Sequence, residues 1–222
     1  MTANRPISAF QPSSAQHVAV KKRQPEDSPI SRAVPYRNTI AAHLVDEATL
    51  RKKSPHVVSI AARHLGEFNL SLAAERGTIG SWLVLDQDEH NIDFINANFG
   101  HHNVTAEVVS FGDLLSEHGK FANRDLVYAA ELLDRLHDEA AVRLIRIMAD
   151  MLNPGGRMMV SNFIPGSLDA SNLENVLDAQ PICRNEIHIL KLFGEALFAE
   201  EAIHIFKDPD NAVVFAIGTR EL

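Results

Sequence analysis

The segment from Arg124 to Phe163 constrains the fold more than any other part of the chain. It holds a short apolar run at residues 126–130, an amphipathic helical pattern, and a second apolar run at residues 158–163. The helical part has apolar residues at every third or fourth position, the period of one helix face. These positions are Ala141, Leu144, Ile145, Met148 and Met151, with Arg143, Arg146 and Asp150 on the other side.

The limits of this helix also follow from the residues. Asp138 is suited to cap its start, and the sequence NPGG at residues 153–156 predicts its end, because proline interrupts the hydrogen-bond ladder and glycine accepts a left-handed turn. Strand, helix, turn and strand in this order form a crossover unit. Such a unit requires parallel strands and almost always takes the right-handed path.

The rest of the chain repeats the alternation, which predicts an α/β fold with a Rossmann-like, open, mostly parallel seven-stranded sheet. A turn-forming DPDN sequence at residues 208–211 predicts a C-terminal antiparallel hairpin at one edge. The expected parallel strands are 57–61, 82–86, 104–109, 125–130 and 157–162, and the hairpin strands are 202–206 and 212–217. Helical patterns begin at residue 38 and recur at 65–74, 88–98, 171–179 and 186–200.

Composition excludes several classes of function. The 222 residues carry a formal charge of −8, whereas a nucleic-acid-binding protein shows a basic footprint. The single cysteine, Cys183, cannot form an intramolecular disulfide and fits a reducing cytoplasm. No apolar run has the length of a membrane span, and the eleven histidines lack metal-ligand spacing. We therefore expect no nucleic acid, membrane or metal partner, and keep a homodimer as an open alternative.

Charge divides the chain into two parts. Residues 1–39 hold six Lys/Arg against two Asp/Glu, a net +4 that leaves −12 for the remainder. This predicts a basic, partly flexible N-terminal arm at residues 1–38 and an α/β domain at residues 39–222. The arm is either a solvated tail or a lid that closes over the acidic body when ligand binds.

The residues that follow each strand are the candidates for binding. An open parallel sheet binds its ligand beyond the carboxyl ends of its strands. Asp86 ends the second expected strand and suits two ribose hydroxyls, while Asp113 follows the third and suits an adenine amino group. The alternative for both aspartates is capping of the next helix.

At this point the chain resembles a family. The order of elements, WLVLDQDE at residues 82–89, Gly112-Asp113 and LNPGGRMMVSNF at residues 152–163 are similar to class I S-adenosylmethionine-dependent methyltransferases. The blocks HLGEFNLS, DLVYAAELLDRL and HIFKDPDNAVVF are similar to the bacterial subgroup linked to synthesis of 3-hydroxypalmitic acid methyl ester. The resemblance implies S-adenosyl-L-methionine as cofactor and a small-molecule substrate.

The sequence departs from this family in the turn after the first strand. Family members carry glycines there because the backbone approaches the cofactor closely. Here Ala61, Arg63 and Leu65 stand at those positions, and Glu131 replaces a glycine after the fourth strand. Because these segments follow neighbouring strands, we expect Arg63 and Glu131 to pair across the pocket.

Site residues follow from the resemblance and from position. The expected cofactor-binding residues are Ser59, Ala61, Arg63, His64, Asp86, Gln87, Gly112, Asp113, Ala129 and Glu131. The candidates for catalysis are Tyr128, Glu131 and Asn162, with Asp134 and His137 nearby.

Three functions remain open. The first is methyl transfer to a small molecule, in bacterial secondary metabolism or signalling. The second is another reaction of the same cofactor, in which its own amino group closes a ring and methylthioadenosine leaves. The third is a non-catalytic relative that serves as a binding subunit.

Overall fold

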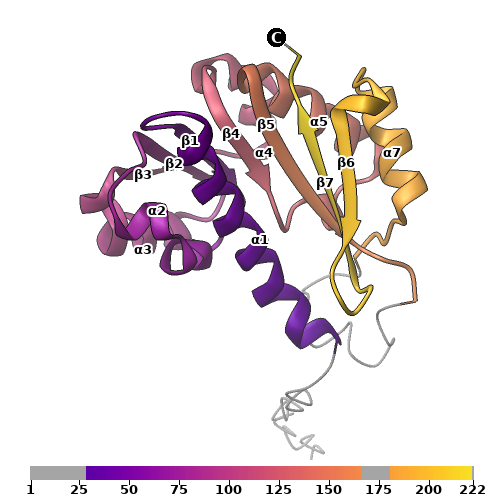
Figure 1. The fold of residues 1–222 in the computed structure, drawn as a ribbon, viewed down its shortest axis with the longest axis horizontal. Coiled ribbons are helices and arrows are strands. Elements are labelled where there is room, and N and C mark those ends of the chain that lie inside the picture. The colour runs from indigo at the N-terminus through magenta and orange to yellow at the C-terminus, as the bar shows by residue number, and fades with distance from the viewer. Residues whose placement is uncertain (1–28, 167–180, 222) are drawn as a thin grey trace, which may run out of the picture.

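A computed structural model of the protein, shown in Figure 1, describes residues 29–166 and 181–221. Seven strands form one sheet in the order β3-β2-β1-β4-β5-β7-β6. The strands are β1 (His56–Ile60), β2 (Ser81–Asp86), β3 (Val104–Val108), β4 (Arg124–Ala129), β5 (Leu152–Phe163), β6 (Ile203–Lys207) and β7 (Val213–Thr219).

The strand directions confirm the predicted sheet. The pairs β1–β2, β1–β4, β2–β3 and β4–β5 are parallel. Strand β7 is antiparallel to β5, and β6 is antiparallel to β7 at the sheet edge. Parallel order reverses between β1 and β4, so the carboxyl ends of these two strands mark the switch point where such sheets bind ligands.

Helices cover both faces of the sheet (Figure 1). One face packs against α1, α2 and α3, and the other against α4, α5 and α7. The helices are α1 (Pro29–Arg51), α2 (Leu72–Glu75), α3 (Glu89–Phe99), α4 (Phe111–Glu117), α5 (Asp138–Met151) and α7 (Glu186–Glu195), with 3-10 turns η1 (Gly66–Leu70), η2 (Gly100–His102), η3 (His118–Phe121), η4 (Leu133–Arg135) and η5 (Glu200–Ala202).

The predicted face of α5 is confirmed. Ala141, Leu144, Ile145, Met148 and Met151 are all fully buried in the core on this side of the sheet. The predicted cap is wrong, because His137 occupies the N-cap position and Asp138 is the first helical residue. The Asp138 carboxylate instead accepts hydrogen bonds from Arg184.

Three other boundaries differ from the sequence prediction. The NPGG residues lie inside β5, where Gly155 has a φ of 74° and a Cβ at Gly156 would approach Asn153 O to 2.8 Å. The expected helix 65–74 is instead η1 followed by the short α2. The last helix stops at Glu195 rather than residue 200. The expected helix 171–179 lies outside the described residues.

Helix α1 begins earlier than the apolar pattern predicted. It runs for 23 residues from Pro29, with Pro35 inside it, so the expected arm boundary at residue 38 falls within this helix. Residues 1–28 lie outside the described part, and closure of the arm over the pocket stays a prediction.

Candidate functional site

A pocket of about 500 Å³ lies at the carboxyl ends of the parallel strands. Its walls come from the segments that follow β1, β2, β3 and β4, as the switch-point rule requires. The lining residues are Ile60, Ala61, Arg63, His64, Leu85, Asp86, Gln87, Asp88, Asn91, Val109, Ser110, Phe111, Leu114, Glu131, Leu132, Arg135 and Leu136. A second hollow of about 580 Å³ lies between the end of α1 and α2, away from these strand ends.

The turn after β1, which lines this pocket, has an unusual conformation. Ala61, Arg63 and Leu65 have positive φ angles of 55°, 50° and 52°, the left-handed region that glycine adopts without strain. Each non-glycine residue in this region costs about 1–2 kcal/mol. The backbone therefore keeps the conformation of a glycine turn although the glycines are absent.

Asp86 holds this turn against the end of β2. Its Oδ2 accepts a hydrogen bond from the Arg63 N–H at 3.2 Å, and its Oδ1 accepts one from the Asp88 N–H at 2.9 Å. A carboxylate offers about four acceptor positions, so two remain for a ligand. The alternative role in helix capping is wrong for Asp86, because Asp88 caps α3 by accepting from the His90 N–H.

Asp113 shows the capping role that was the alternative to binding. Its carboxylate accepts from the Ser110 backbone and hydroxyl groups in a capping box at the start of α4, and the hydrogen bond from the Ser110 side chain lowers the Asp113 pKa. Neither Asp113 nor Gly112 lines the pocket, whereas Ser110 and Phe111 do.

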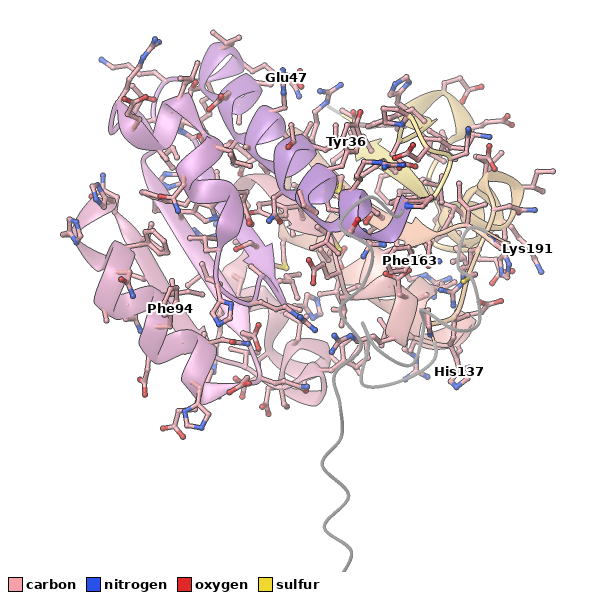
Figure 2. All side chains as sticks on the ribbon, turned by 90° about the horizontal axis from the view of Figure 1, so that it is seen from below. Tyr36, Glu47, Phe94, His137, Phe163 and Lys191 are labelled. Carbon is pink, nitrogen blue, oxygen red and sulfur yellow. The ribbon has the colours of Figure 1, made fainter. Side chains whose placement is uncertain are left out.

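The expected pairing of Arg63 with Glu131 is confirmed. Arg63 Nε lies 3.4 Å from Glu131 Oε2, across the pocket between the exits of β1 and β4. His64 and Gln87 are exposed at the same pocket, and the His64 ring packs edge-on against Phe94 of α3 at 4.9 Å. Phe94 lies in the left part of the view in Figure 2.

Three other expected site residues are buried away from the pocket. Ser59 and Tyr128 are neighbours in the register of β1 and β4, and Ala129 follows in the core. The Tyr128 hydroxyl donates to Glu67 Oε1 at 2.5 Å. Burial raises the Glu67 pKa to about 7, and burial together with the nearby Glu67 raises the Tyr128 pKa.

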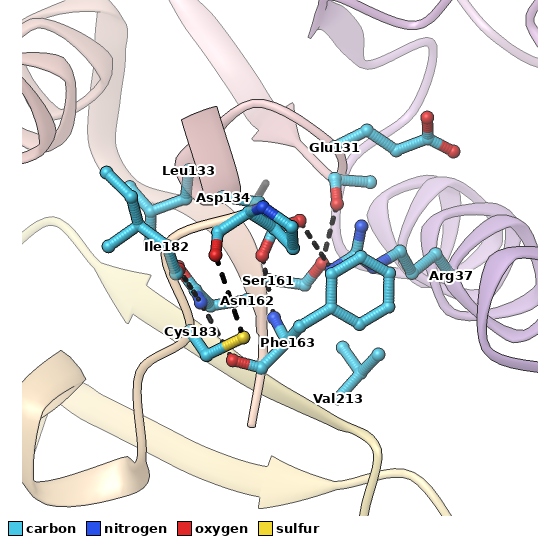
Figure 3. Close-up of polar contacts among 12 residues, drawn as sticks. Arg37, Glu131, Leu133, Asp134, Ser161, Asn162, Phe163, Ile182, Cys183 and Val213 are labelled. Carbon is cyan, nitrogen blue, oxygen red and sulfur yellow. Dashed lines mark hydrogen bonds and ion pairs between the residues drawn. The ribbon is translucent and has the colours of Figure 1, made fainter. Parts of the chain in front are cut away.

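Asn162 and Asp134 belong to a buried polar cluster beyond the pocket (Figure 3). Asp134 Oδ2 accepts from Arg37 Nη2 at 2.8 Å, and its Oδ1 accepts from the Phe163 N–H at 2.7 Å. Asn162 Oδ1 accepts from buried Arg184 at 2.9 Å. These contacts tie α1, β5 and the segment before α7 to the exit of β4. His137 is exposed at the start of α5 and does not line the pocket.

The structure thus brings six of the expected residues together and leaves the others elsewhere. Ala61, Arg63, His64, Asp86, Gln87 and Glu131 line the pocket. Sequence reasoning missed Asn91 and Leu132 as lining residues; Asn91, three residues after Asp88 on α3, was detectable from helical spacing. Within residues 29–166 and 181–221 no cluster of potential metal ligands is found, and no helix is long and apolar enough to cross a membrane.

Solved structures of other proteins share this fold. A possible exported protein from Bordetella parapertussis has a TM-score of 0.68 at 15% identity, covering 89% of this chain and 71% of its own. The CurJ carbon methyltransferase has a TM-score of 0.65 at 13% identity, covering 86% of this chain and 55% of its own. Magnesium protoporphyrin IX methyltransferase from Synechocystis PCC 6803, solved with bound SAH, has a TM-score of 0.61 at 13% identity and 90% coverage of both chains.

These likenesses, at such low identities, concern the fold. The matched part spans only about half of the CurJ methyltransferase chain. No protein-family model and no curated protein matches the sequence. The protein therefore has a Rossmann-like α/β fold that S-adenosylmethionine-dependent methyltransferases also have.

Proposed function

We propose that this protein binds S-adenosyl-L-methionine in the pocket at the ends of β1, β2, β3 and β4 and transfers its methyl group to a small molecule. The observation that carries the proposal is the position of Asp86, a buried carboxylate at the end of β2 that lines the pocket and keeps acceptor positions. A ribose offers two hydroxyl donors to such a group.

The rest of the pocket supports the same orientation. Val109, Ser110 and Phe111 provide a partly apolar wall after β3, where an adenine ring would lie beyond the ribose. The turn at residues 61–65 follows β1, on the other side of β2 from β3, and lines the pocket through Ala61, Arg63 and His64. The cofactor would then extend from β3 across β2 and β1 toward β4.

For the proposed reaction, the main task of the protein is to position the two reactants. Methyl transfer is an in-line displacement at an already activated sulfonium carbon, so holding the acceptor and the methyl group in line supplies most of the effect. Of the three candidate catalytic residues, Glu131 alone lines the pocket, where it is ion-paired with Arg63. The proposal therefore assigns no proton transfer to Tyr128 or Asn162.

Replacing Asp86 tests the proposal. Asp86→Ala removes a charge-assisted hydrogen bond, and we expect S-adenosylmethionine to bind about 10- to 100-fold more weakly in titration calorimetry. Asp86→Asn, which keeps the side-chain size and one acceptor oxygen, should show a smaller loss. Asp93→Ala, an exposed aspartate of α3 outside the pocket, is the matched control and should bind as wild type does.

Product analysis separates the three functions. Methyl transfer releases S-adenosylhomocysteine, ring closure releases methylthioadenosine without an acceptor, and a binding subunit releases neither. If wild type gives no heat and no thermal shift with millimolar S-adenosylmethionine, the cofactor proposal fails and the binding-subunit alternative replaces it. Equal binding by wild type and Asp86→Ala would assign Asp86 to the loop alone.

The finer expectations belong to the same proposal. They are the likeness to the 3-hydroxypalmitic acid methyl ester subgroup, a role in bacterial secondary metabolism or signalling, a cytoplasmic location and a homodimer. The sequence blocks support the subgroup likeness and its role, the single cysteine supports the cytoplasmic location, and the homodimer stays an open alternative.

A further inference from the structure

We propose that Arg63 and Glu131 together form the binding site for the α-amino acid group of the cofactor. In this proposal Arg63 binds the α-carboxylate and Glu131 binds the α-ammonium group. It rests on the proposed function, because it assigns the end of the cofactor that Asp86 does not reach.

The two side chains lie where each could exchange its contact with the other for a contact with a ligand. Both line the 500 Å³ pocket, and they come from the exits of neighbouring strands β1 and β4. Their contact joins Arg63 Nε to Glu131 Oε2 at 3.4 Å, longer than a usual charge-assisted hydrogen bond. The Arg63 side chain is 47% exposed and that of Glu131 is 20% exposed, so solvent and solutes reach both charges.

The chemistry of the pair matches an amino acid zwitterion. A guanidinium group presents parallel N–H donors that fit a carboxylate in a two-point contact, and a glutamate accepts from an ammonium group. The ion pair joins Glu131 to Nε of Arg63, and the guanidinium group also carries two Nη groups as donors. A ligand that carries both charges on one carbon can replace the contact within the pair by one contact to each partner.

Stability alone does not explain this arginine. Position 63 is left-handed, with a φ of 50°, which is costly for any side chain that has a Cβ. An exposed ion pair contributes little to folding and does not offset that cost. The Asp86 carboxylate nevertheless holds the Arg63 N–H, so the groups proposed to contact the ribose and the amino acid are linked through one backbone hydrogen bond.

Three ligands test the proposal by calorimetry. S-Adenosylmethionine carries both charges, decarboxylated S-adenosylmethionine lacks the carboxylate, and 5′-methylthioadenosine lacks both. We expect Arg63→Ala to bind S-adenosylmethionine about 10- to 100-fold more weakly while its affinity for the other two ligands stays as in wild type. Glu131→Gln, which keeps the shape of the side chain, should weaken S-adenosylmethionine and its decarboxylated form and leave methylthioadenosine unchanged.

Arg135→Ala is the matched control. Arg135 lines the same pocket and lies on η4, so this change lowers the charge of the pocket without removing the pair. It should leave the ratio of S-adenosylmethionine to methylthioadenosine affinity close to that of wild type.

The outcomes separate this proposal from the proposed function. If wild type binds methylthioadenosine as tightly as S-adenosylmethionine, the nucleoside site stands and the Arg63–Glu131 assignment is overturned. Equal losses for all three ligands in Arg63→Ala also overturn it, because they show a general change in the loop. If wild type binds none of the three, both proposals fall.

Discussion

Two arginine–carboxylate pairs lie near the exit of β4, and they differ in almost every physical respect. Arg37 and Asp134 are 2% and 4% exposed and meet at 2.8 Å, and the Arg37 guanidinium also lies 4.1 Å from the centre of the Phe163 ring. Arg63 and Glu131 are 47% and 20% exposed and meet at 3.4 Å. The first pair joins α1 to the core, whereas the second spans a pocket.

The difference shows how the same edge of a sheet can hold a fixed backbone and still present charged side chains to solvent. A buried pair is costly to break because its partner is left as an uncompensated charge. An exposed pair is screened by water and exchanges its partners at little cost. The Arg37 pair therefore fixes the position of the β4 exit, and the Arg63 pair leaves charged groups available there.

The largest expected effect comes from breaking the buried pair. Arg37→Ala leaves Asp134 buried without a cation and removes the contact with Phe163, so we expect it to lower the free energy of unfolding by about 3–5 kcal/mol. Urea denaturation followed by circular dichroism measures this. Arg63→Ala in the same assay should change stability by no more than about 1 kcal/mol. Equal effects of the two substitutions would contradict the comparison.

Glu67 sharpens the comparison, because it is a buried carboxylate whose partner is neutral. Tyr128 donates to Glu67, whose pKa is raised by burial from 4.5 to about 7. The folded state therefore holds a proton that the unfolded state releases between these pH values. This contribution to stability is complete below about pH 4.5 and is lost as the pH rises through about 7.

We therefore expect Glu67→Gln to remove a decline in stability with rising pH. Between pH 5 and 8, the unfolding free energy of wild type should fall relative to the variant by on the order of 3 kcal/mol. Urea titrations at several pH values measure the difference. Glu75→Gln, an exposed glutamate of α2, is the control and should run parallel to wild type. Parallel curves for Glu67→Gln would show that Glu67 is ionised in the folded protein at neutral pH.

Most of the sheet and one feature of the site could be predicted from the sequence. Apolar runs and helical spacing are local signals, so the strands and α5 follow from them directly. The Arg63–Glu131 pair could be predicted because the strand order makes β1 and β4 neighbours.

Contacts between residues far apart in the chain have no local sequence pattern from which they could be predicted. Glu67 and Tyr128 are separated by 61 positions, and Arg37 and Asp134 by 97. An arginine in a basic segment is expected to be exposed to solvent. Arg37 is buried instead, because α1 crosses the sheet. Tyr128 and Asn162 were expected at the site since they lie near strand ends, but sequence position does not determine on which face of a strand a side chain packs.

The smallest expected effect concerns the left-handed turn that lines the pocket after β1. Glycine adopts a φ of 50° without the steric cost that an alanine retains, so Arg63→Gly should be more stable than Arg63→Ala by about 1 kcal/mol. Both variants lose the ion pair, so the comparison isolates the backbone. Urea denaturation of the two proteins side by side measures the difference.

Arg76 provides the opposite control. It is exposed at the end of α2 with a right-handed φ of −82°, where glycine only adds freedom to the unfolded chain. Arg76→Ala should therefore be more stable than Arg76→Gly by roughly 0.5–1 kcal/mol, the reverse of the order at position 63. The same order at both positions would mean that residue 63 is not left-handed in solution, and the turn would then direct the Arg63 side chain elsewhere than toward Glu131.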